Sequence, residues 1–279
     1  MPDIAYVNGR FGSLADAVVS IEDRGFQFGD GVYEVIRTYR GQPFAIEEHM
    51  ARLERSAQAL QLSIGQTSAQ WSSLIREGLR LSQLPEAKIY LQITRGQAPR
   101  DHPFPVSSAP TTVLTFRELH PLDVSVRNAG VQAMSVEDIR WGRCDIKSVN
   151  LLANVLARQR AKEAGVFEAI LVREGTVTEG SVSNVMVVRN GAVQTAPEGR
   201  RILSGVTRAI VLDLARKEGI PVAESFVTRE ELLAASEVFL TGTTVEVLPV
   251  VRVDGHMIGG GSPGPVSQLL SRRFEALIG

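Results

Sequence analysis

The sequence predicts an α+β fold of two domains, in which helices flank mixed, largely antiparallel sheets. Compact runs rich in β-branched residues alternate with amphipathic segments along the 279 residues. Three dipeptides typical of tight hairpin turns, Asn8-Gly9, Asn190-Gly191 and Asp254-Gly255, lie between or beside such runs. These turns favour antiparallel pairing over an all-parallel, doubly wound sheet.

The expected strands are short runs of alternating or continuous apolar residues. In chain order they are Ile4–Val7, Val32–Tyr39, Lys88–Thr94, Thr111–Phe116, Val131–Val136, Ala169–Arg173, Val185–Val188 and Val238–Thr241. The stretch from 97 to 110, between the third run and the fourth, holds four prolines and no periodicity. It is therefore predicted to be a surface loop.

Five segments with apolar residues gathered on one face are expected to be helices. They cover residues 47–62, 70–81, 148–164, 206–218 and about 265–277. Gly165 and Gly219 follow the third and the fourth, and each can take the left-handed conformation that ends a helix. A break at His120–Asp123 is the expected boundary between a smaller domain, residues 1–120, and a larger one, residues 121–279.

Composition excludes several classes of function. With 30 basic and 31 acidic residues the formal charge is −1, which gives no general attraction to nucleic acid or to a membrane surface. A single cysteine excludes an intrachain disulfide framework, and four scattered histidines show no metal-ligand spacing. Asp3 lies where a signal peptide would be basic, and no apolar run approaches the ~20 residues of a membrane span. We expect a cytoplasmic protein.

Lys147 is the first candidate for chemistry, because Ile146, Val149 and Leu151 surround it in the sequence. An amine among apolar side chains loses hydration, which disfavours its protonated form and leaves a nucleophile that can condense with an aldehyde. The alternative is a lysine that extends into solvent from the first turn of a helix.

Glu179 is the second candidate, at the end of an expected pair of strands. A carboxylate beside a heteroaromatic cofactor can keep the ring nitrogen protonated and so make the ring an electron sink. The segment that follows, Gly180–Asn184, can supply hydroxyls and backbone amides. A solvated acid in a turn is the alternative.

Two further segments can bind an anion. Val206 and Thr207 begin an expected helix, and the free amides of a helix amino terminus favour phosphate. Thr241–Thr244 follows an apolar strand and offers a second cluster of amides and hydroxyls. An ordinary capped helix and a strand-end turn are the alternatives. The chain has neither a Walker sequence nor a Gly-x-Gly-x-x-Gly after a strand, which argues against nucleoside triphosphates and dinucleotides.

Three residues can hold a carboxylate. Arg100 and His102 lie two residues apart in the proline-rich loop, and Tyr33 lies in an expected strand. A guanidinium that grips a carboxylate with paired hydrogen bonds, helped by an imidazole and a phenol, suits an amino acid or a keto acid. The alternatives are solvated loop residues and a core tyrosine.

Five segments carry a resemblance that covers nearly the whole chain. They are Glu-Asp-Arg-Gly-Phe-Gln-Phe-Gly-Asp-Gly-Val-Tyr-Glu (22–34), Thr-Arg-Gly followed by Pro-Arg-Asp-His (94–102), Glu-Asp-Ile-Arg-Trp (137–141), Arg-Cys-Asp-Ile-Lys-Ser (143–148) and Thr-Glu-Gly-Ser (178–181). In them the chain resembles the fold-type IV family of pyridoxal-phosphate enzymes, and within it the D-amino acid aminotransferases of bacteria.

The resemblance implies a role for each candidate, with pyridoxal 5′-phosphate bound to the larger domain. Lys147 would carry the cofactor as an internal aldimine and then move the proton, and Glu179 would pair with the pyridine nitrogen. Arg52, Thr207 and the amides of Val206 and Thr243 would bind the phosphate, and Leu203 would pack on the ring. Gly242 stands where relatives often have serine, which removes a hydroxyl and keeps an amide, and Val182 also replaces a frequent serine.

The resemblance also implies a substrate and an assembly. Tyr33, Arg100 and His102 would hold the substrate carboxylate, the last two lent by the neighbouring subunit of a homodimer. The implied reaction is transamination between D-amino acids, such as D-alanine, and the 2-oxo acids 2-oxoglutarate and pyruvate. Alternatives of the same fold are a branched-chain L-amino acid aminotransferase, an (R)-amine transaminase and an aminodeoxychorismate lyase. A non-catalytic ligand-binding protein is the alternative from another class.

Overall fold

The structure, a computed structural model, describes residues 3–279 and divides into two compact units. Unit 1 contains the described residues up to His120 together with Ile146–Asn150, and unit 2 contains Pro121–Asp145 and Leu151–Gly279. The sequence analysis placed residues 146–150 in the second domain. The structure instead groups them with unit 1, because they pair with one of its strands.

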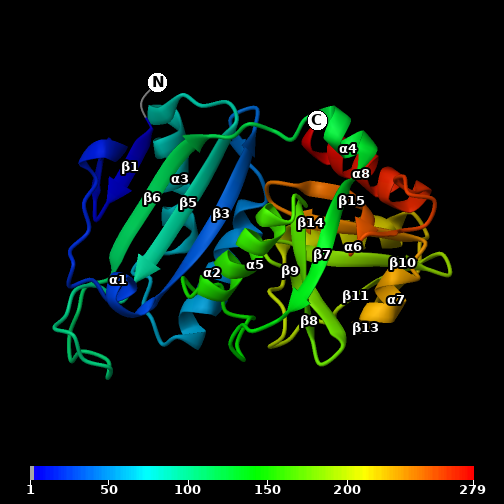
Figure 1. Ribbon diagram of the computed structural model, residues 1–279. Helices are drawn as coiled ribbons and strands as arrows, with labels where there is room; N and C mark the ends of the chain where they lie inside the picture. Colours follow the sequence, from blue (N-terminus) through cyan, green and yellow to red (C-terminus); the bar gives the residue numbers. More distant parts are fainter. Residues whose placement is uncertain (1–2) are drawn as a thin grey trace. The chain divides into compact units, whose positions relative to one another are not determined.

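Unit 1 is built on one antiparallel sheet of six strands in the order β2-β1-β6-β5-β3-β4. The strands are β1 (Ile4–Val7), β2 (Arg10–Ser13), β3 (Gly31–Tyr39), β4 (Gln42–Pro43), β5 (Ala87–Thr94) and β6 (Thr111–Glu118). Figure 1 shows β1, β6, β5 and β3 side by side in this order. The long central pairs β3–β5 and β5–β6 are fully in register, as expected for strands whose apolar side chains share one face.

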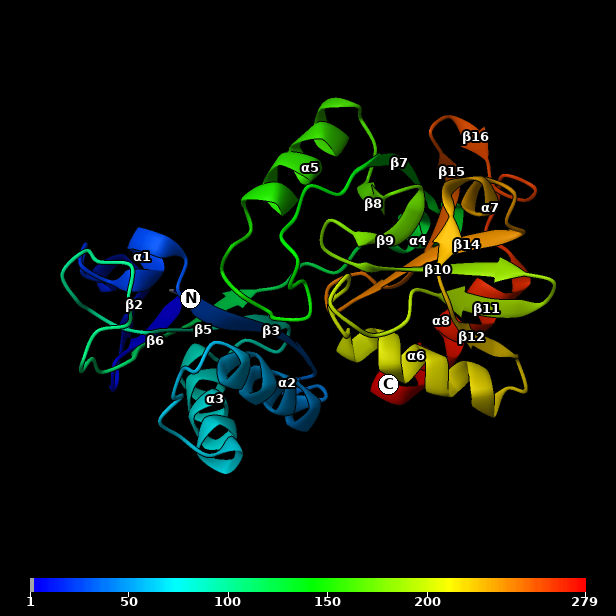
Figure 2. The ribbon, with the colours of Figure 1, turned by 90° about the horizontal axis from the view of Figure 1, so that it is seen from below.

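Two amphipathic helices, α2 (Ile46–Ala59) and α3 (Ser68–Ser82), cover one face of this sheet, as Figure 2 shows. Between sheet and helices lies the core of unit 1, which includes Ile36, Met50, Leu53, Trp71, Ile75, Ile89, Leu91 and Phe116. Thr67 caps α3 with a reciprocal capping box, which fixes where the helix begins. Two short helical turns, η1 (Leu14–Asp16) and α1 (Arg24–Phe28), precede β3.

The segment 146–150 lies against the beginning of β3. The Tyr33 amide donates to the Lys147 carbonyl over 3.0 Å, and the Val149 amide donates to the Gly31 carbonyl over 3.1 Å. A helix was expected from Ser148, but Ser148 forms a β-bridge with Val32, and α5 (Leu152–Glu163) begins only after the segment ends. The predicted beginning of this helix was wrong because pairing with β3 outweighs local helix propensity.

Unit 2 contains a ten-stranded mixed sheet in the order β12-β11-β10-β14-β15-β7-β8-β9-β13, with β16 paired to β15. Its strands are β7 (Val131–Glu137), β8 (Glu168–Arg173), β9 (Thr176–Gly180), β10 (Asn184–Arg189), β11 (Ala192–Thr195), β12 (Val222–Glu224), β13 (Val227–Thr228), β14 (Glu237–Gly242), β15 (Glu246–Val253) and β16 (His256–Met257). β7 runs parallel to β8 and to β15, and β11 runs parallel to β12; the other pairs are antiparallel. The predicted mixed, largely antiparallel fold is confirmed.

Helices cover unit 2 as well. α6 (Val206–Lys217) and α8 (Pro265–Ile278) lie side by side and pack against β14 and β15, while α5 packs against β7 and β8 (Figure 2). The short helices α4 (Val124–Ala129) and α7 (Arg229–Leu233) complete the unit. No helix among residues 3–279 has both the length and the apolar character that a membrane span requires.

Candidate active site

The backbone of Lys147 is held by two elements of unit 1. Its amide donates to Oγ of Ser56 on α2 over 3.1 Å, and its carbonyl accepts from the Tyr33 amide on β3. These bonds fix the point from which the side chain projects. The alternative of a lysine on the first turn of a helix is therefore wrong, since the helix begins at Leu152.

The amine of Lys147 lies over an aromatic ring. Its Nζ is 4.2 Å from the centroid of the Tyr33 ring, and the residue is half-buried. The Tyr33 ring lies 5.6 Å from that of Tyr90, and burial, followed by the proximity of Tyr33, raises the pKa of Tyr90 to about 12. The Tyr33 ring thus provides a face against which the amine of Lys147 lies.

A buried ionic cluster lies within electrostatic reach of Lys147. Nε and Nη2 of Arg52 donate to the two oxygens of Glu34, each over 2.8 Å, and Nδ1 of His49 lies 2.7 Å from the same carboxylate. Burial would raise the pKa of Glu34, but the charge and hydrogen bonds of Arg52, helped by His49, hold it far below its usual value. Burial lowers the pKa of His49, and the charges of Arg52 and Lys147 lower it further against the opposing effect of Glu34.

Sequence reasoning missed Glu34, His49 and Ser56, although a signal for them exists. His49, Arg52 and Ser56 follow one another at spacings of three and four residues, which places them on one face of α2. That face also carries the apolar side chains that define the helix, such as Met50. Polar residues on a buried face must find polar partners, so the stripe itself predicts a cluster.

Arg100 and His102 come together around one ring. The guanidinium of Arg100 lies 4.6 Å from the Phe28 ring centroid, and the His102 ring lies 5.4 Å from it. Nη1 of Arg24 donates to the Asp101 carbonyl over 2.6 Å and so anchors the loop between the two residues. Both side chains are exposed on unit 1, whereas Tyr33 lies beside Lys147.

In unit 2, Glu179 lies on β9 and three groups donate to it. Nη1 of Arg140 donates to Oε1, and Nδ2 of Asn184 and the amide of Leu203 each donate to Oε2 over 3.0 Å. The residue is only 5% exposed. The alternative of a solvated turn acid is therefore wrong. The proposed packing of the Leu203 side chain on a cofactor ring stays a prediction.

Arg140 is itself held by a second carboxylate. Its Nε and Nη2 donate to the two oxygens of Asp138, each over 2.9 Å. Burial would raise the pKa of Asp138 and lower that of Arg140, but the hydrogen bonds and charges of the pair outweigh it in both cases. The pKa of Asp138 is held below its usual value and that of Arg140 above. Sequence reasoning quoted this segment and did not assign it a role.

Helix α6 begins with an open amino terminus. Its N-cap, Gly205, has no side chain to cap the helix, and among residues 3–279 no hydrogen bond is made to the amides of Val206 and Thr207. A Cβ at Gly205 would lie 2.0 Å from Oδ1 of Asn184, so a larger residue does not fit. The positive end of a helix dipole with two available amides suits a phosphate.

The end of strand β14 offers a further donor. Thr241 pairs with Asn184 in the sheet, and its hydroxyl is buried without a hydrogen-bond partner among the residues that the structure describes. Gly242 and Thr243 follow it and are half-buried. A buried hydroxyl with no partner in the chain indicates a position where a ligand or a water supplies one.

The serines after Glu179 have a structural task. The hydroxyls of Ser181 and Ser183 both donate to the fully buried Glu168. A buried carboxylate at this place requires donors, and these two hydroxyls supply them. Val182 between them is 66% exposed and leaves that network intact.

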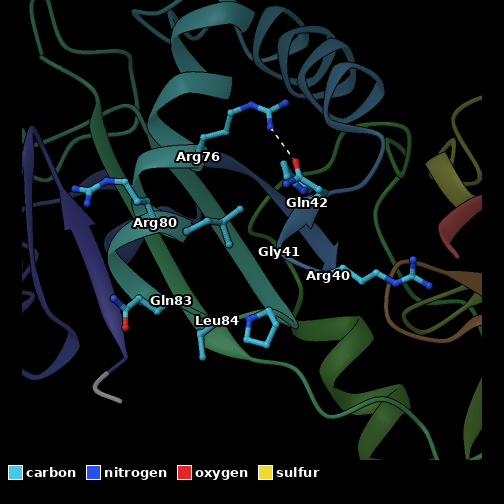
Figure 3. A pocket seen from close by; sticks show the side chains of 10 residues that line it. Arg40, Gly41, Gln42, Arg76, Arg80, Gln83 and Leu84 are labelled. Carbon is cyan, nitrogen blue, oxygen red and sulfur yellow. Dashed lines mark hydrogen bonds between the residues drawn. The ribbon is translucent and has the colours of Figure 1, made fainter.

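A separate pocket in unit 1 does not bring charges together. It has a volume of about 420 Å³ and is lined by Arg40, Gly41, Gln42, Pro43, Arg76, Leu79, Arg80, Gln83, Leu84 and Pro85. Figure 3 shows Arg40 and Arg80 extending away from each other, while Arg76 turns toward Gln42 and donates to it over 3.4 Å. The pairing of Arg80 with Glu77 also withdraws that charge. The pocket therefore lacks the convergent groups of a catalytic site.

The donors and acceptors described above fit a phosphorylated heteroaromatic aldehyde. Glu179 can accept from a protonated ring nitrogen, and the amides of Val206 and Thr207 with the Thr241 hydroxyl can donate to a phosphate. Lys147 supplies an amine able to form an imine. Pyridoxal phosphate combines a ring nitrogen, a phosphate and an aldehyde in one molecule.

The sequence matches one described family over most of its length. The model of amino-transferase class IV covers residues 31–253. The D-alanine aminotransferase of Bacillus licheniformis is 46% identical over 97% of the chain and 95% of its own length. That of Staphylococcus haemolyticus is 42% identical over 98% and 97%.

Solved structures of branched-chain amino acid aminotransferases are also similar. The enzyme of Escherichia coli matches with a TM-score of 0.93 and 29% identity over the whole chain and 95% of its own length. That of Thermoproteus uzoniensis, solved with norvaline, gives a TM-score of 0.88 and 28% identity over 99% of the chain and 94% of its own length. A further structure of this kind of enzyme contains pyridoxamine 5′-phosphate. These likenesses confirm the fold that the sequence resemblance implied.

Proposed function

The chain belongs to the class IV aminotransferases, and we propose that it transfers amino groups between D-amino acids, such as D-alanine, and 2-oxo acids, with pyridoxal 5′-phosphate as cofactor. The observation that carries this proposal is the identity of 46% and 42% with D-alanine aminotransferases over nearly full length. The buried, triply hydrogen-bonded Glu179 and the half-buried Lys147 supply the chemistry that such a reaction requires.

When bound, pyridoxal phosphate supplies an electron sink for the bond that breaks at the substrate α-carbon. Lys147 would hold the cofactor covalently and, once freed, would act as general base and then general acid, taking the proton from the substrate α-carbon and delivering it to the cofactor. Glu179 holds the proton at the ring nitrogen. A positioned base typically contributes ~10²- to 10⁴-fold to the rate.

The phosphate is assigned to one cationic side chain and to several uncharged donors. Arg52 of unit 1 presents a guanidinium that Glu34 already orients, which lowers the entropy cost of binding an anion. In unit 2 the amides of Val206 and Thr207, and the turn at Gly242 and Thr243, supply uncharged donors, and Leu203 supplies an apolar contact to the ring. The charge of Arg52 is shared with Glu34, so the amides carry a large part of this binding.

The substrate carboxylate is assigned to Tyr33, Arg100 and His102. If the substrate carboxylate and the substrate side chain exchanged their pockets, the opposite hand of the α-carbon would face the same lysine. The position of the carboxylate-binding residues therefore sets the stereochemistry. The proximity of Arg100 and His102 around Phe28 supports a shared function of the two. Their exposure on unit 1 supports the inference that they serve the site of a neighbouring subunit.

A homodimer is part of this proposal. Large apolar side chains are exposed on each unit: Val18, Val19, Ile21, Phe26, Phe104 and Val106 on unit 1, and Ile139, Trp141, Leu152, Val155, Leu156 and Val182 on unit 2. Exposed large apolar side chains are typical of interaction surfaces. Phe104 and Val106 belong to the loop that contains Arg100 and His102, and Arg24, which precedes Phe26, donates to the Asp101 and His102 carbonyls of that loop. The expected cytoplasmic location stays a prediction.

Mixing two inactive variants tests the shared site. Lys147→Ala removes the amine and Arg100→Ala removes the guanidinium that would bind the substrate carboxylate, so each homodimer should have low activity. A mixed dimer would contain one site with both defects and one intact site. We expect activity to reappear when the two variants are unfolded and refolded together. Failure to complement, with hybrid dimers detected by mass spectrometry, would show that both residues serve the same subunit's site.

The high structural similarity to branched-chain aminotransferases favours a second candidate, an L-specific enzyme. The identity of such an enzyme with this chain is lower, 29% against 46%. The decisive assay offers D-alanine, D-glutamate and the L-enantiomers of branched-chain amino acids in parallel with 2-oxoglutarate or pyruvate. We expect turnover of the D-amino acids. Preferential turnover of L-leucine or L-valine would overturn the proposed specificity and leave the reaction type in place.

A further inference from the structure

Arg140 of unit 2 joins two buried carboxylates. Its Nε and Nη2 donate to the two oxygens of Asp138, and its Nη1 donates to Oε1 of Glu179. The Arg140 side chain is 6% exposed and that of Asp138 is fully buried. A planar guanidinium with hydrogen bonds to carboxylates on two of its edges has one orientation. The positive charge of Arg140 therefore lies at a fixed place beside Glu179.

Further contacts make this orientation rigid. Nη2 of Arg140 also donates to the Arg201 carbonyl over 3.2 Å, and the Arg140 amide donates to Asp138 over 3.1 Å. Asp138 in turn accepts from the Thr178 hydroxyl over 3.0 Å, and Arg173 lies 3.1 Å from it. The network fixes Asp138 from several sides, so Asp138 can act as the clamp of the guanidinium.

The charges of this network nearly cancel before any ligand binds. Asp138 and Glu179 are opposed by Arg140 and Arg173, and burial raises the pKa of the neighbouring Cys144 so that its thiol stays neutral. An ion pair of Asp138 with Arg140 would be complete by itself. Instead the third nitrogen of the guanidinium is directed at a second carboxylate, which a purely structural pair does not require.

We propose that Arg140, clamped by Asp138, is a positioning residue that keeps Glu179 ionised, so that a proton shared between Glu179 and the cofactor's ring nitrogen resides on the nitrogen. This inference rests on the proposed function. A proton shared by two bases stays on the one with the higher proton affinity, and an adjacent cation lowers that of a carboxylate. Asn184 and the Leu203 amide act in the same direction from the other oxygen.

Glu179 and Arg140 thus have two separate tasks, which a single acidic residue cannot perform alone. Glu179 provides the acceptor for the ring N–H, and Arg140 decides on which partner the proton stays. Without Arg140 the carboxylate would be a stronger base in a buried place, and the neutral acid would donate to an unprotonated ring. The ring would then withdraw electrons less strongly, and the chemical step would slow while substrate binding remained.

The test measures the protonation state of the ring nitrogen directly. The holoenzyme and its variants are loaded with pyridoxal phosphate labelled with ¹⁵N in the ring, and the ¹⁵N chemical shift distinguishes the protonated from the neutral ring. We expect the protonated shift in the unchanged enzyme and in Arg140→Lys, which keeps the charge, and a displacement toward the neutral shift in Arg140→Met. The kcat of Arg140→Met should fall on the order of 10²-fold, typical of one lost electrostatic partner, with KM for D-alanine little changed.

Arg173→Met is the matched control. Arg173 contacts Asp138 and donates to the Arg140 carbonyl over 2.9 Å, yet within the described part of the chain it forms no hydrogen bond or ion pair with Glu179. Its removal disturbs the same network without removing the charge next to the acceptor, and it should leave the ¹⁵N shift unchanged. If the shift moves equally in Arg173→Met and Arg140→Met, a general structural disturbance explains it and the inference is wrong.

Two outcomes separate this inference from the proposed function. If the unchanged enzyme binds no pyridoxal phosphate, the proposed function fails. If the unchanged enzyme and a folded, cofactor-loaded Arg140→Met both show the protonated shift, Arg140 does not decide the position of the proton. Arg140→Gln provides a second route should Arg140→Met not fold, because it keeps an amide that can donate to Asp138 or Glu179 and removes the charge. A displaced shift in Arg140→Gln supports the inference, and an unchanged shift contradicts it.

Discussion

Each unit contains an arginine that a buried carboxylate holds by Nε and Nη2. In unit 1 Glu34 holds Arg52, and in unit 2 Asp138 holds Arg140. In unit 1 the carboxylate also contacts His49, and in unit 2 the arginine also donates to the carboxylate of Glu179. The same local device therefore orients a cation for two different purposes.

The two arginines differ in the anionic group that each one binds besides its buried carboxylate. Arg140 binds an acidic residue of the chain, Glu179, and so lowers the proton affinity of that residue. Arg52 is assigned to an anionic ligand, and its charge is already partly balanced by Glu34. A buried pair with balanced charges is stable without a ligand, which keeps the site folded while the cofactor is absent. Loss of one member of either pair should consequently cost more than loss of both.

Glu34→Gln should have the largest effect on stability. It leaves Arg52 buried without its carboxylate, and breaking a buried pair in this way costs about 3–5 kcal/mol. Denaturant unfolding of the protein without cofactor measures the change. The double variant Glu34→Gln with Arg52→Met removes the uncompensated charge and should recover most of the loss. A double variant no more stable than the single one would show that the pair is not the cause.

Gly205→Ala should have the next largest effect, on the unit 2 side of the comparison. Its Cβ would lie 2.0 Å from Oδ1 of Asn184, which must then move and give up its hydrogen bond to Glu179. A hydrogen bond to a charged group contributes about 1.5–3 kcal/mol, so cofactor affinity should fall about 10- to 100-fold. Titration of the cofactor-free protein with pyridoxal phosphate measures this.

Gly142→Ala is the control for that substitution, because a Cβ at Gly142 meets nothing within 4 Å. It should bind pyridoxal phosphate as the unchanged protein does. Equal affinities for Gly205→Ala and Gly142→Ala would contradict the importance of the close approach between Gly205 and Asn184.

The smallest expected effect concerns pH and the second partner of Glu34. Burial lowers the pKa of His49 below the 6.5 of an exposed imidazole. Below this pH the imidazole therefore binds a proton in the unfolded chain but not in the folded protein. Stability should thus fall as pH decreases from about 6.5 toward the folded-state pKa, by at most ~1.4 kcal/mol per pH unit. The depressed pKa of Glu34 adds a similar loss only below its usual value of 4.5.

His49→Asn isolates this contribution, because an amide can still donate to Glu34 and does not titrate. The free energy of unfolding, measured by denaturant from about pH 8 to about pH 5.5, should decline less steeply in the variant than in the unchanged protein. Parallel curves would show that His49 titrates alike in the folded and unfolded states.

The sequence predicted the parts of the fold that local patterns encode. The core strands of unit 1 and the helices α2, α3, α6 and α8 follow from apolar periodicity. Strand β15 was missed because Pro249 interrupts its β pattern. The structure tolerates this proline because β7 pairs with β15 only from Val250 onward, so the missing amide is not required on that side.

The candidate site could be predicted from the sequence only in part. Lys147 and Glu179 were proposed from their neighbours in the sequence, and the structure gives each of them polar partners. The roles of Asp138 and Arg140 were not assigned, because they depend on the bond from Arg140 to Glu179, which lies on strand β9. The spacing of His49, Arg52 and Ser56 on α2 indicates a polar cluster, but periodicity within one helix does not identify Glu34 of β3 as the partner of His49 and Arg52.

Lys147 is proposed to carry the cofactor, and covalent trapping shows whether it does. Reduction of the holoenzyme with borohydride, followed by proteolysis and mass spectrometry, locates the lysine to which the pyridoxyl group becomes fixed. We expect the pyridoxyl group on Lys147, and no such modification in Lys147→Ala. A pyridoxyl group on a different lysine, or an unmodified Lys147 in an enzyme that retains D-amino acid turnover, would contradict it.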